Sequence, residues 1–179
     1  MPTSIEDAQR VIRAQGGDRQ ALETLLRSVQ PRLYRYVSRL VGGDDAPDVV
    51  QETLIAIARK LAWLVDPALF HPWAFRIASR AAFRHLHREI RHRRQAVDDA
   101  DVEAIAAPEP PPPEDLLREL LDSDEVSPAS RAVLVLHFQE ELPLADVAAI
   151  LEIPLGTAKS RLAYGLKALR RHLAERRSM

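Results

Sequence analysis

Apolar residues recur every three or four positions along most of this 179-residue chain, the spacing that aligns them on one face of an α-helix. In the first half of the sequence they predict helices over residues 5–14, 19–41 and 46–63 and a further helix that begins at Pro72. The second half predicts helices over 116–121 and 127–139, and then a helical pair within 142–173. The sequence has no turn-punctuated alternating runs of the kind that indicate β-strands, so we expect an all-α fold.

Short polar residues mark where several of these helices should begin. Four of them precede a helical segment and can accept hydrogen bonds from its free backbone amides: Ser4, Asp18, Asp45 and Ser127. Pro31 falls inside the second segment, where a proline should kink the helix or split it in two.

The most specific local pattern lies between Leu142 and Leu173, where two helices are joined by a tight turn at Glu152 and Ile153. The positions that should face inward are Leu144, Val147, Ala148 and Leu151, then Leu155, Ala158, Leu162, Leu166 and Leu169. Pro154 suits the first turn of the second helix, and Gly156 should permit a close contact there. The side chains left toward water are Thr157, Lys159, Ser160, Arg161, Tyr164 and Lys167. This pattern is typical of a helix-turn-helix, whose second helix enters the major groove of DNA.

The formal net charge of −1 conceals a strong separation of charge along the sequence. Residues 76–94 hold seven arginines against one glutamate, and residues 155–179 hold seven basic residues against one glutamate, so each segment carries +6. Residues 98–125 hold eleven acids against one arginine, a net charge of −10. We interpret the two basic segments as binding the same polyanion, which would repel the acidic tract between them. The alternative for the C-terminal segment is an ordinary helical hairpin with a solvated basic face.

The acidic tract also contains five prolines within six residues, at Pro108 and Pro110–Pro113, which favours a semi-rigid spacer. A disordered tether would explain this composition equally well. We therefore expect two small helical domains, residues 1–94 and 116–179, joined by an acidic, proline-rich linker over 95–115. The N-terminus lacks the apolar core of a signal peptide, and no stretch approaches the roughly 18–20 apolar residues of a membrane span, so a cytoplasmic protein without membrane insertion is expected.

A basic ridge is expected on the helix that begins at Pro72, where arginines repeat every three or four residues: Arg76, Arg80, Arg84, Arg88 and Arg91. The preceding loop, residues 63–71, should leave Leu64, Leu69 and Phe70 near a surface. Arginines hold phosphates while aromatic or loop pockets accept unstacked bases, so the pairing suits single-stranded or melted DNA. The alternative is that the aromatic residues are simply core, which is the interpretation we favour for Trp73.

The C-terminal sequence IPLGTAKSRLAYGLKALR is similar to the recognition-helix signature of region 4 in bacterial extracytoplasmic-function (ECF) sigma factors. The positions that match are Pro154, Gly156, Thr157, Lys159, Ser160, Arg161 and Leu162. LuxR-type regulators share parts of this pattern. Upstream, DDAPDVVQETLIAIARKL and FHPWAFRIASR resemble two consecutive runs of sigma region 2, so both regions occur in the family's order on either side of a linker.

The resemblance implies an ECF sigma factor that binds the clamp helices and the flap region of core RNA polymerase and directs promoter-specific transcription initiation. It implies polymerase contacts by Asp48, Gln51, Glu52, Ile55 and Arg59. It implies contacts to the minus-10 element by Leu64, Phe70, His71, Arg76, Arg80 and Arg84. It implies contacts to the minus-35 element by Thr157, Lys159, Ser160, Arg161, Tyr164 and Lys167. An anti-sigma factor is expected as a further partner, and no cofactor is implied.

The chain departs from the family pattern at several of these positions. Pro47 stands where an acidic residue is usual, and Arg80 and Arg84 stand where asparagine and aspartate are common. Tyr164 replaces a frequent arginine, and Glu152 replaces a frequent turn glycine.

The sequence offers little to a catalytic or metal-binding function. Cysteine is absent, which excludes disulfides and thiolate metal sites. Three of the six histidines cluster at His85, His87 and His92, but residues two apart on a helix point in different directions. We find no phosphate-binding glycine loop, nucleophile elbow or apolar carboxylate pair, so we do not expect an enzyme or a metal site. Two rivals stay open: a helix-turn-helix regulator that never joins polymerase, and a sigma-like decoy whose partners are proteins.

Overall fold

The computed structural model describes residues 3–93 and 126–177, and within these ranges it contains helices but no β-strand. The chain divides into two compact units, residues 1–94 and 95–179. The prediction of an all-α chain with two helical domains is confirmed. The linker expected over 95–115 and the helix expected over 116–121 lie outside the described residues. In the described part of the chain, none of the helices is long and apolar enough to cross a bilayer.

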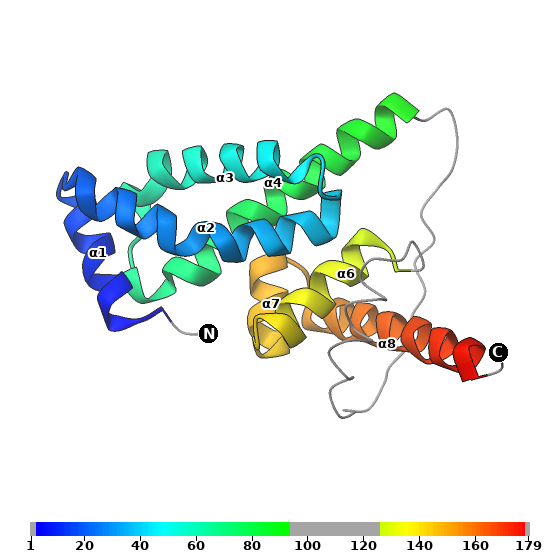
Figure 1. Ribbon diagram of the computed structural model, residues 1–179. Helices are drawn as coiled ribbons and strands as arrows, with labels where there is room; N and C mark the ends of the chain where they lie inside the picture. The colour runs from blue at the N-terminus through cyan, green and yellow to red at the C-terminus, as the bar shows by residue number, and fades with distance from the viewer. Residues whose placement is uncertain (1–2, 94–125, 178–179) are drawn as a thin grey trace. The chain divides into compact units, whose positions relative to one another are not determined.

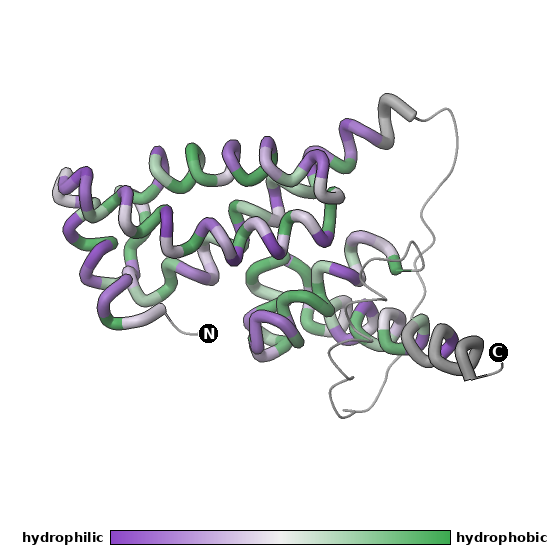
Figure 2. Tube along the Cα trace, viewed as in Figure 1, coloured by the Kyte–Doolittle hydropathy of each residue, from purple (hydrophilic) through white to green (hydrophobic). Residues whose placement is uncertain are grey.

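Four helices form the described part of the first unit: α1 (Ile5–Gln15), α2 (Arg19–Val41), α3 (Ala46–Lys60) and α4 (Phe70–Arg93). Two short 3-10 turns, η1 (Leu61–Trp63) and η2 (Pro67–Leu69), lie between α3 and α4. Helix α2 packs against the other three helices, and α1 lies at the end of the bundle where α2 begins (Figure 1). Hydrophobic and hydrophilic stretches alternate along α2 and α3, as the periodic pattern predicts (Figure 2).

The core of the first unit centres on an aromatic pair from α2 and α4. The rings of Tyr36 and Phe75 meet edge to face, with centroids 5.4 Å apart, and both side chains are buried. The Tyr36 hydroxyl shares a 2.7 Å hydrogen bond with Ser79 Oγ, which satisfies a polar group that would otherwise be buried alone. Burial raises the pKa of Tyr36 far above its ordinary value, so the phenol stays neutral.

All three predicted helix starts in this unit are confirmed, but the side-chain cap expected at one of them is not made. Ser4 Oγ accepts a 3.0 Å hydrogen bond from the backbone amide of Asp7, and Asp18 Oδ1 accepts one from Ala21. Asp45 occupies the N-cap position of α3 but makes no capping bond, because its carboxylate lies instead 3.2 Å from His85 Nε2. Pro31 does not split the second helix, since α2 runs continuously through it.

The second unit is a helix-turn-helix supported by a preceding helix. Its elements within residues 126–177 are α6 (Pro128–Leu134), a π-helical turn η3 (Val135–Gln139), α7 (Leu144–Leu151) and α8 (Leu155–Arg177). Ser127 caps α6 as predicted, with Oγ accepting a 3.2 Å hydrogen bond from Ser130. Helix α8 packs against both α6 and α7, and the buried side chains include Leu134, Leu136 and Ile150.

Helix α8 is packed most tightly against its neighbour at Gly165, not at Gly156 as expected. A Cβ on Gly165 would lie 2.6 Å from Leu134 Cδ1, whereas a Cβ on Gly156 would meet nothing within 4 Å. Leu155 was expected to face inward but is 42% exposed, because the buried stripe of α8 runs through smaller residues at Ala158, Gly165 and Ala168. Pro154 immediately precedes α8, and its carbonyl accepts a 3.1 Å hydrogen bond from Ala158.

Candidate nucleic-acid interface

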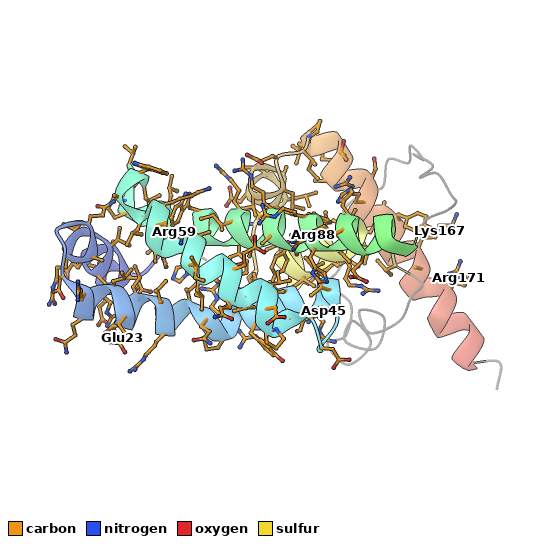
Figure 3. The ribbon with its side chains drawn as sticks, turned by 90° about the horizontal axis from the view of Figure 1, so that it is seen from above. Glu23, Asp45, Arg59, Arg88, Lys167 and Arg171 are labelled. Carbon is orange, nitrogen blue, oxygen red and sulfur yellow. The ribbon has the colours of Figure 1, made fainter. Side chains whose placement is uncertain are left out.

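The six polar residues predicted to face water lie on the first half of α8. Lys159, Tyr164 and Lys167 are exposed, and Tyr164 retains 52% of its surface. Thr157, Ser160 and Arg161 are half-buried, and Ser160 Oγ donates a 3.0 Å hydrogen bond back to the Gly156 carbonyl. Lys167 and Arg171 project from neighbouring turns of the same helix (Figure 3). This helix therefore presents several hydrogen-bond donors from one continuous backbone.

The turn before α8 contains a residue in the left-handed conformation. Glu152 has φ 57° and ψ 41°, and its backbone amide donates to the Ala148 carbonyl. The amide of Ile153 donates to the same carbonyl at 3.0 Å. These bonds end α7 and set the direction in which α8 leaves it.

Helix α3 carries the residues expected to meet the polymerase. Asp48, Gln51, Ile55 and Arg59 are exposed, and Ile55 is unusual among them as an apolar side chain with 46% of its surface accessible. Asp45 and Arg59 lie toward opposite ends of this helix (Figure 3). Beside them, between α2 and α3, lies a groove of about 330 Å³ lined by Gln30, Tyr34, Pro47, Val50, Gln51 and Leu54.

Glu52, the remaining member of that set, is paired with the basic face of α4. Its Oε1 lies 2.6 Å from Arg84 Nη2, and its Oε2 lies 3.8 Å from Arg88 Nη2. Arg80 is exposed, and Arg76 is half-buried with its Nε enclosed and without a hydrogen-bond partner. The acidic side of α3 and the basic side of α4 are therefore neighbours.

Three of the residues expected at the minus-10 element are buried, and the expectation that Leu64 and Phe70 lie near a surface is wrong. Leu64, Phe70 and His71 retain only 8%, 0% and 6% of their surfaces. Phe70 and His71 form the first turn of α4, where Phe70 enters the core.

The exposed apolar residues of this segment are instead Trp63, Val65 and Leu69, at 74%, 96% and 52%. Leu64 is extended, so its neighbours point to the opposite side of the backbone. Trp73, for which we favoured a core position, is half-buried.

Polar side chains from the N-terminal helix hold this segment, and sequence patterns did not reveal them. Gln15 Nε2 donates to the carbonyls of Leu61 and Leu64, at 2.9 and 2.8 Å. At the other end, the backbone amide of His71 donates to Thr3 Oγ1 at 3.2 Å, and His71 Nε2 lies 3.2 Å from Asp7 Oδ2.

The His71 and Asp7 side chains are buried together and shift each other's ionisation. Burial, assisted by the positive charge of Arg32, lowers the pKa of His71 although Asp7 opposes the shift. Burial also disfavours the charged form of Asp7, but hydrogen bonds from Arg10 and His71 outweigh it and leave the pKa of Asp7 below its ordinary value. The Arg10 bond spans 2.8 Å. A neutral imidazole beside a carboxylate therefore joins α1 to α4.

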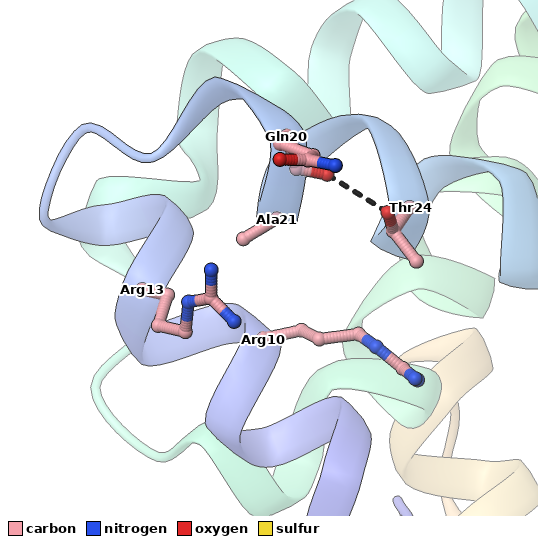
Figure 4. Close-up of a pocket in the computed structure, with 5 residues that line it drawn as sticks. All are labelled: Arg10, Arg13, Gln20, Ala21 and Thr24. Atoms are coloured by element: carbon pink, nitrogen blue, oxygen red, sulfur yellow. Dashed lines mark hydrogen bonds between the residues drawn. The ribbon is translucent and has the colours of Figure 1, made fainter.

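A second hollow, of about 270 Å³, lies between α1 and α2 (Figure 4). It is lined by Arg10, Arg13, Gln20, Ala21 and Thr24. Both arginines already pair with carboxylates, since Arg10 bonds Asp7 and Arg13 lies 2.6 Å from Asp18. Its positive charge is therefore already compensated.

Two further histidines of α4 lie close to protein acceptors. His85 lies against Asp45, and His87 Nδ1 lies 2.6 Å from the Phe83 carbonyl. Within residues 3–93 and 126–177, no three side chains among histidines and acids are grouped so as to hold a metal ion.

Comparison with protein families finds two matches. Residues 25–92 match the family model of sigma-70 region 2, and residues 124–171 match that of sigma-70 region 4. The chain is 30% identical over 185 residues to the ECF RNA polymerase sigma-E factor of Salmonella typhi, covering 94% of this chain and 95% of the relative. It is 33% identical over 175 residues to the ECF RNA polymerase sigma factor SigE of Mycolicibacterium smegmatis, covering 90% of this chain and 66% of the relative.

Two solved structures share the fold. CnrH, solved in complex with the cytosolic domain of CnrY, gives a TM-score of 0.64 at 20% identity, covering 95% of this chain and 98% of CnrH. The sigma factor RpoE of Bartonella quintana, solved in complex with the anti-sigma factor NepR, gives 0.65 at 22% identity, covering 85% of this chain and 96% of RpoE.

Proposed function

The chain belongs to the ECF RNA polymerase sigma factor family, and we propose that it binds core RNA polymerase and directs it to promoters by contacts with the minus-10 and minus-35 elements. The observation that carries this proposal is that both sigma regions occur, in order, in one chain whose second unit exposes a basic recognition helix. Membership of a family of sigma factors, together with the chemistry of these surfaces, favours a binding protein over an enzyme.

The first unit is proposed to dock on the clamp helices of the polymerase through the exposed face of α3. Asp48, Gln51 and Glu52 supply acceptors, Arg59 supplies a donor, and Ile55 supplies an apolar contact. Such a surface, apolar at its centre and polar around it, has the composition of a protein interface. The second unit is proposed to reach the flap region.

The same unit is proposed to hold the minus-10 strand beside its basic helix. Trp63, Val65 and Leu69 expose apolar surface on which unstacked bases can rest, in place of the buried residues first expected. Arg76, Arg80 and Arg84 lie along α4 and can hold phosphates. Because Arg84 is paired with Glu52, the proposed strand and polymerase surfaces meet at this ion pair.

The second unit is proposed to place α8 in the major groove of the minus-35 element. Thr157, Ser160 and Arg161 lie in its first two turns, where residues of a recognition helix reach base edges. Lys159, Tyr164 and Lys167 are suited to phosphates and to the edges of the groove.

An anti-sigma factor is proposed as the regulator. RpoE of Bartonella quintana, whose fold this chain shares, was solved in complex with such a protein. In this chain, the exposed apolar residues Trp63, Val65 and Leu69 offer one surface for such a partner. A partner bound there would cover the surface proposed for the minus-10 strand.

Reconstituted transcription with purified core polymerase across a promoter library tests the function and reads the sequence preference together. We expect run-off product from promoters that share two elements at a fixed spacing, and a strong loss when Arg161 and Lys167 are both reversed to glutamate. A regulator that never joins polymerase would bind DNA but leave core enzyme behind in a pull-down. A protein-binding decoy would capture its partners unaffected by the reversal and yield no run-off product.

A further inference from the structure

We propose that α1 is a positioning element for the segment that carries Trp63, Val65 and Leu69, which it holds at both ends. Gln15 is the positioning residue at the first end and Asp7 at the second. The inference rests on the proposed function, in which this segment receives the minus-10 strand.

At the first end, one side chain satisfies two backbone carbonyls. Gln15 Nε2 donates to Leu61 at 2.9 Å and to Leu64 at 2.8 Å, across 46 and 49 residues of sequence. These carbonyls bracket the turn η1 in which Trp63 lies. A primary amide has two N–H donors, and both have an acceptor here. The position of Trp63 is therefore tied to α1.

At the second end, α1 and the residues before it hold the start of α4. The Thr3 hydroxyl accepts from the His71 amide at 3.2 Å, and the Asp7 carboxylate faces His71 Nε2 at 3.2 Å. Asp7 is itself fixed by Arg10, at 2.8 Å, and by the cap at Ser4. His71 directly follows Phe70, so this second tie fixes the point at which the segment enters the core.

The segment held in this way exposes three apolar side chains to solvent, Trp63, Val65 and Leu69. Val65 is 96% exposed and Trp63 is 74% exposed, so packing contributes little to their positions. Holding the backbone in place before binding lowers the conformational entropy lost when a strand is captured. Loosening α1 should therefore weaken capture of single-stranded DNA without changing the chemistry of the surface.

The sharpest variant is Gln15→Glu, which keeps the size of the side chain but replaces the donors with acceptors. A carboxylate at this position would face two carbonyl oxygens and repel them. Gln9→Glu is the matched control, because it makes the same change at an exposed position of the same helix. Gln15→Met removes both donors without adding charge.

The experiment uses holoenzyme assembled from the full chain and core polymerase, with fork DNA whose minus-10 strand is single-stranded. We expect Gln15→Glu to weaken fork binding about tenfold, within the range of one lost base stack. Core association and binding to a duplex that ends upstream of the minus-10 element should be unchanged. Hydrogen exchange should rise in residues 61–71 and stay constant in α2. Gln9→Glu should match the parent chain in every measurement.

Several results would overturn the inference. One is unchanged fork binding by Gln15→Glu and Gln15→Met in holoenzymes that assemble normally. Another is a loss of core association and fork binding together in both variants, which would make Gln15 a general stability residue. If the parent holoenzyme itself does not bind fork DNA, the proposed function fails, whatever the Gln15 variants do.

Discussion

The recognition helix of the second unit and the segment of the first unit that carries Trp63 and Val65 are held in place by different means. In the second unit the candidate contact residues lie on one helix, so the backbone hydrogen bonds of α8 and the burial of Ala158 and Ala168 set their positions. In the first unit, Trp63 and Val65 lie between helices and depend on polar side chains such as Gln15. Packing therefore positions one surface, and side-chain to backbone hydrogen bonds position the other.

This difference predicts that the second unit is more sensitive than the first to an increase in the volume of a buried side chain. A Cβ at Gly165 would lie 2.6 Å from Leu134 Cδ1 and 3.0 Å from its Cγ, and Leu134 is fully buried. Gly165→Val should therefore destabilise the second unit by about 2–3 kcal/mol, the upper part of the roughly 1–3 kcal/mol that overpacking a core usually costs. The measurement is hydrogen exchange in α6 and α8 of the full chain.

Gly156→Val is the matched control on the same helix. Its Cβ would meet nothing within 4 Å, so the expected change is below about 0.5 kcal/mol. Both tryptophans of the chain, Trp63 and Trp73, lie in the first unit, so their fluorescence should report an unchanged unfolding of that unit. Equal effects of the two valines would contradict the close packing of α8 against α6.

The next largest effect is expected at the recognition helix. Arg161→Ala should weaken minus-35 binding by holoenzyme by about 1–3 kcal/mol if the guanidinium reads a base. Lys167→Ala, at an exposed position six residues further along the helix, should weaken binding to all sequences alike. Affinities measured on single-base variants of the minus-35 element separate the two. A uniform loss with Arg161→Ala would make it a phosphate contact.

The sequence predicted the second unit better than the first because helical periodicity is local. Lys159, Tyr164 and Lys167 were assigned to the exposed face from spacing alone, and the structure places them there. Spacing misjudged the centre of the buried stripe, where Gly165 lies. The spacing assigned the leucines of this helix to the buried face. Only a residue without a side chain, Gly165, lets α8 approach Leu134 this closely.

The first unit shows what periodicity does not contain. Leu64 and Phe70 were expected near a surface because they lie in the loop between two predicted helices, yet both are buried. Gln15 reads as an ordinary polar residue at a helix end, and its acceptors lie 46 and 49 residues away. Such contacts depend on the tertiary fold, so they cannot be predicted from a single sequence.

The turns of the two units also differ in backbone strain. Gly17 and Gly42 provide positive φ in the first unit, whereas Glu141 and Glu152 do so in the second. Glu152→Gly should therefore stabilise the second unit by about 1 kcal/mol relative to Glu152→Ala, because alanine keeps the penalty of the left-handed conformation. Comparing these two variants by hydrogen exchange in α7 removes the contribution of the glutamate side chain. Equal stabilities would show that the turn is unstrained.

The smallest effect is expected from pH, which should change the stability of the first unit through its buried polar groups, His71 and Asp7. Burial and the charge of Arg32 hold the pKa of His71 in the folded chain below the ordinary value of 6.5, despite Asp7. As pH falls below that value, the unfolded chain takes up a proton before the folded chain does, so stability declines. Asp7, whose folded pKa lies below 3.8, loses its contribution only in stronger acid.

Tryptophan fluorescence during urea unfolding, followed from pH 7 to pH 5, measures this decline for the first unit alone. His71→Gln should flatten the slope, because the group that takes up the proton is gone, even if the variant is less stable throughout. His87→Gln, at an exposed position of the same helix, should keep the slope of the parent chain. If both variants showed the parent slope, another group would control the pH dependence, and the buried link between α1 and α4 would not be its source.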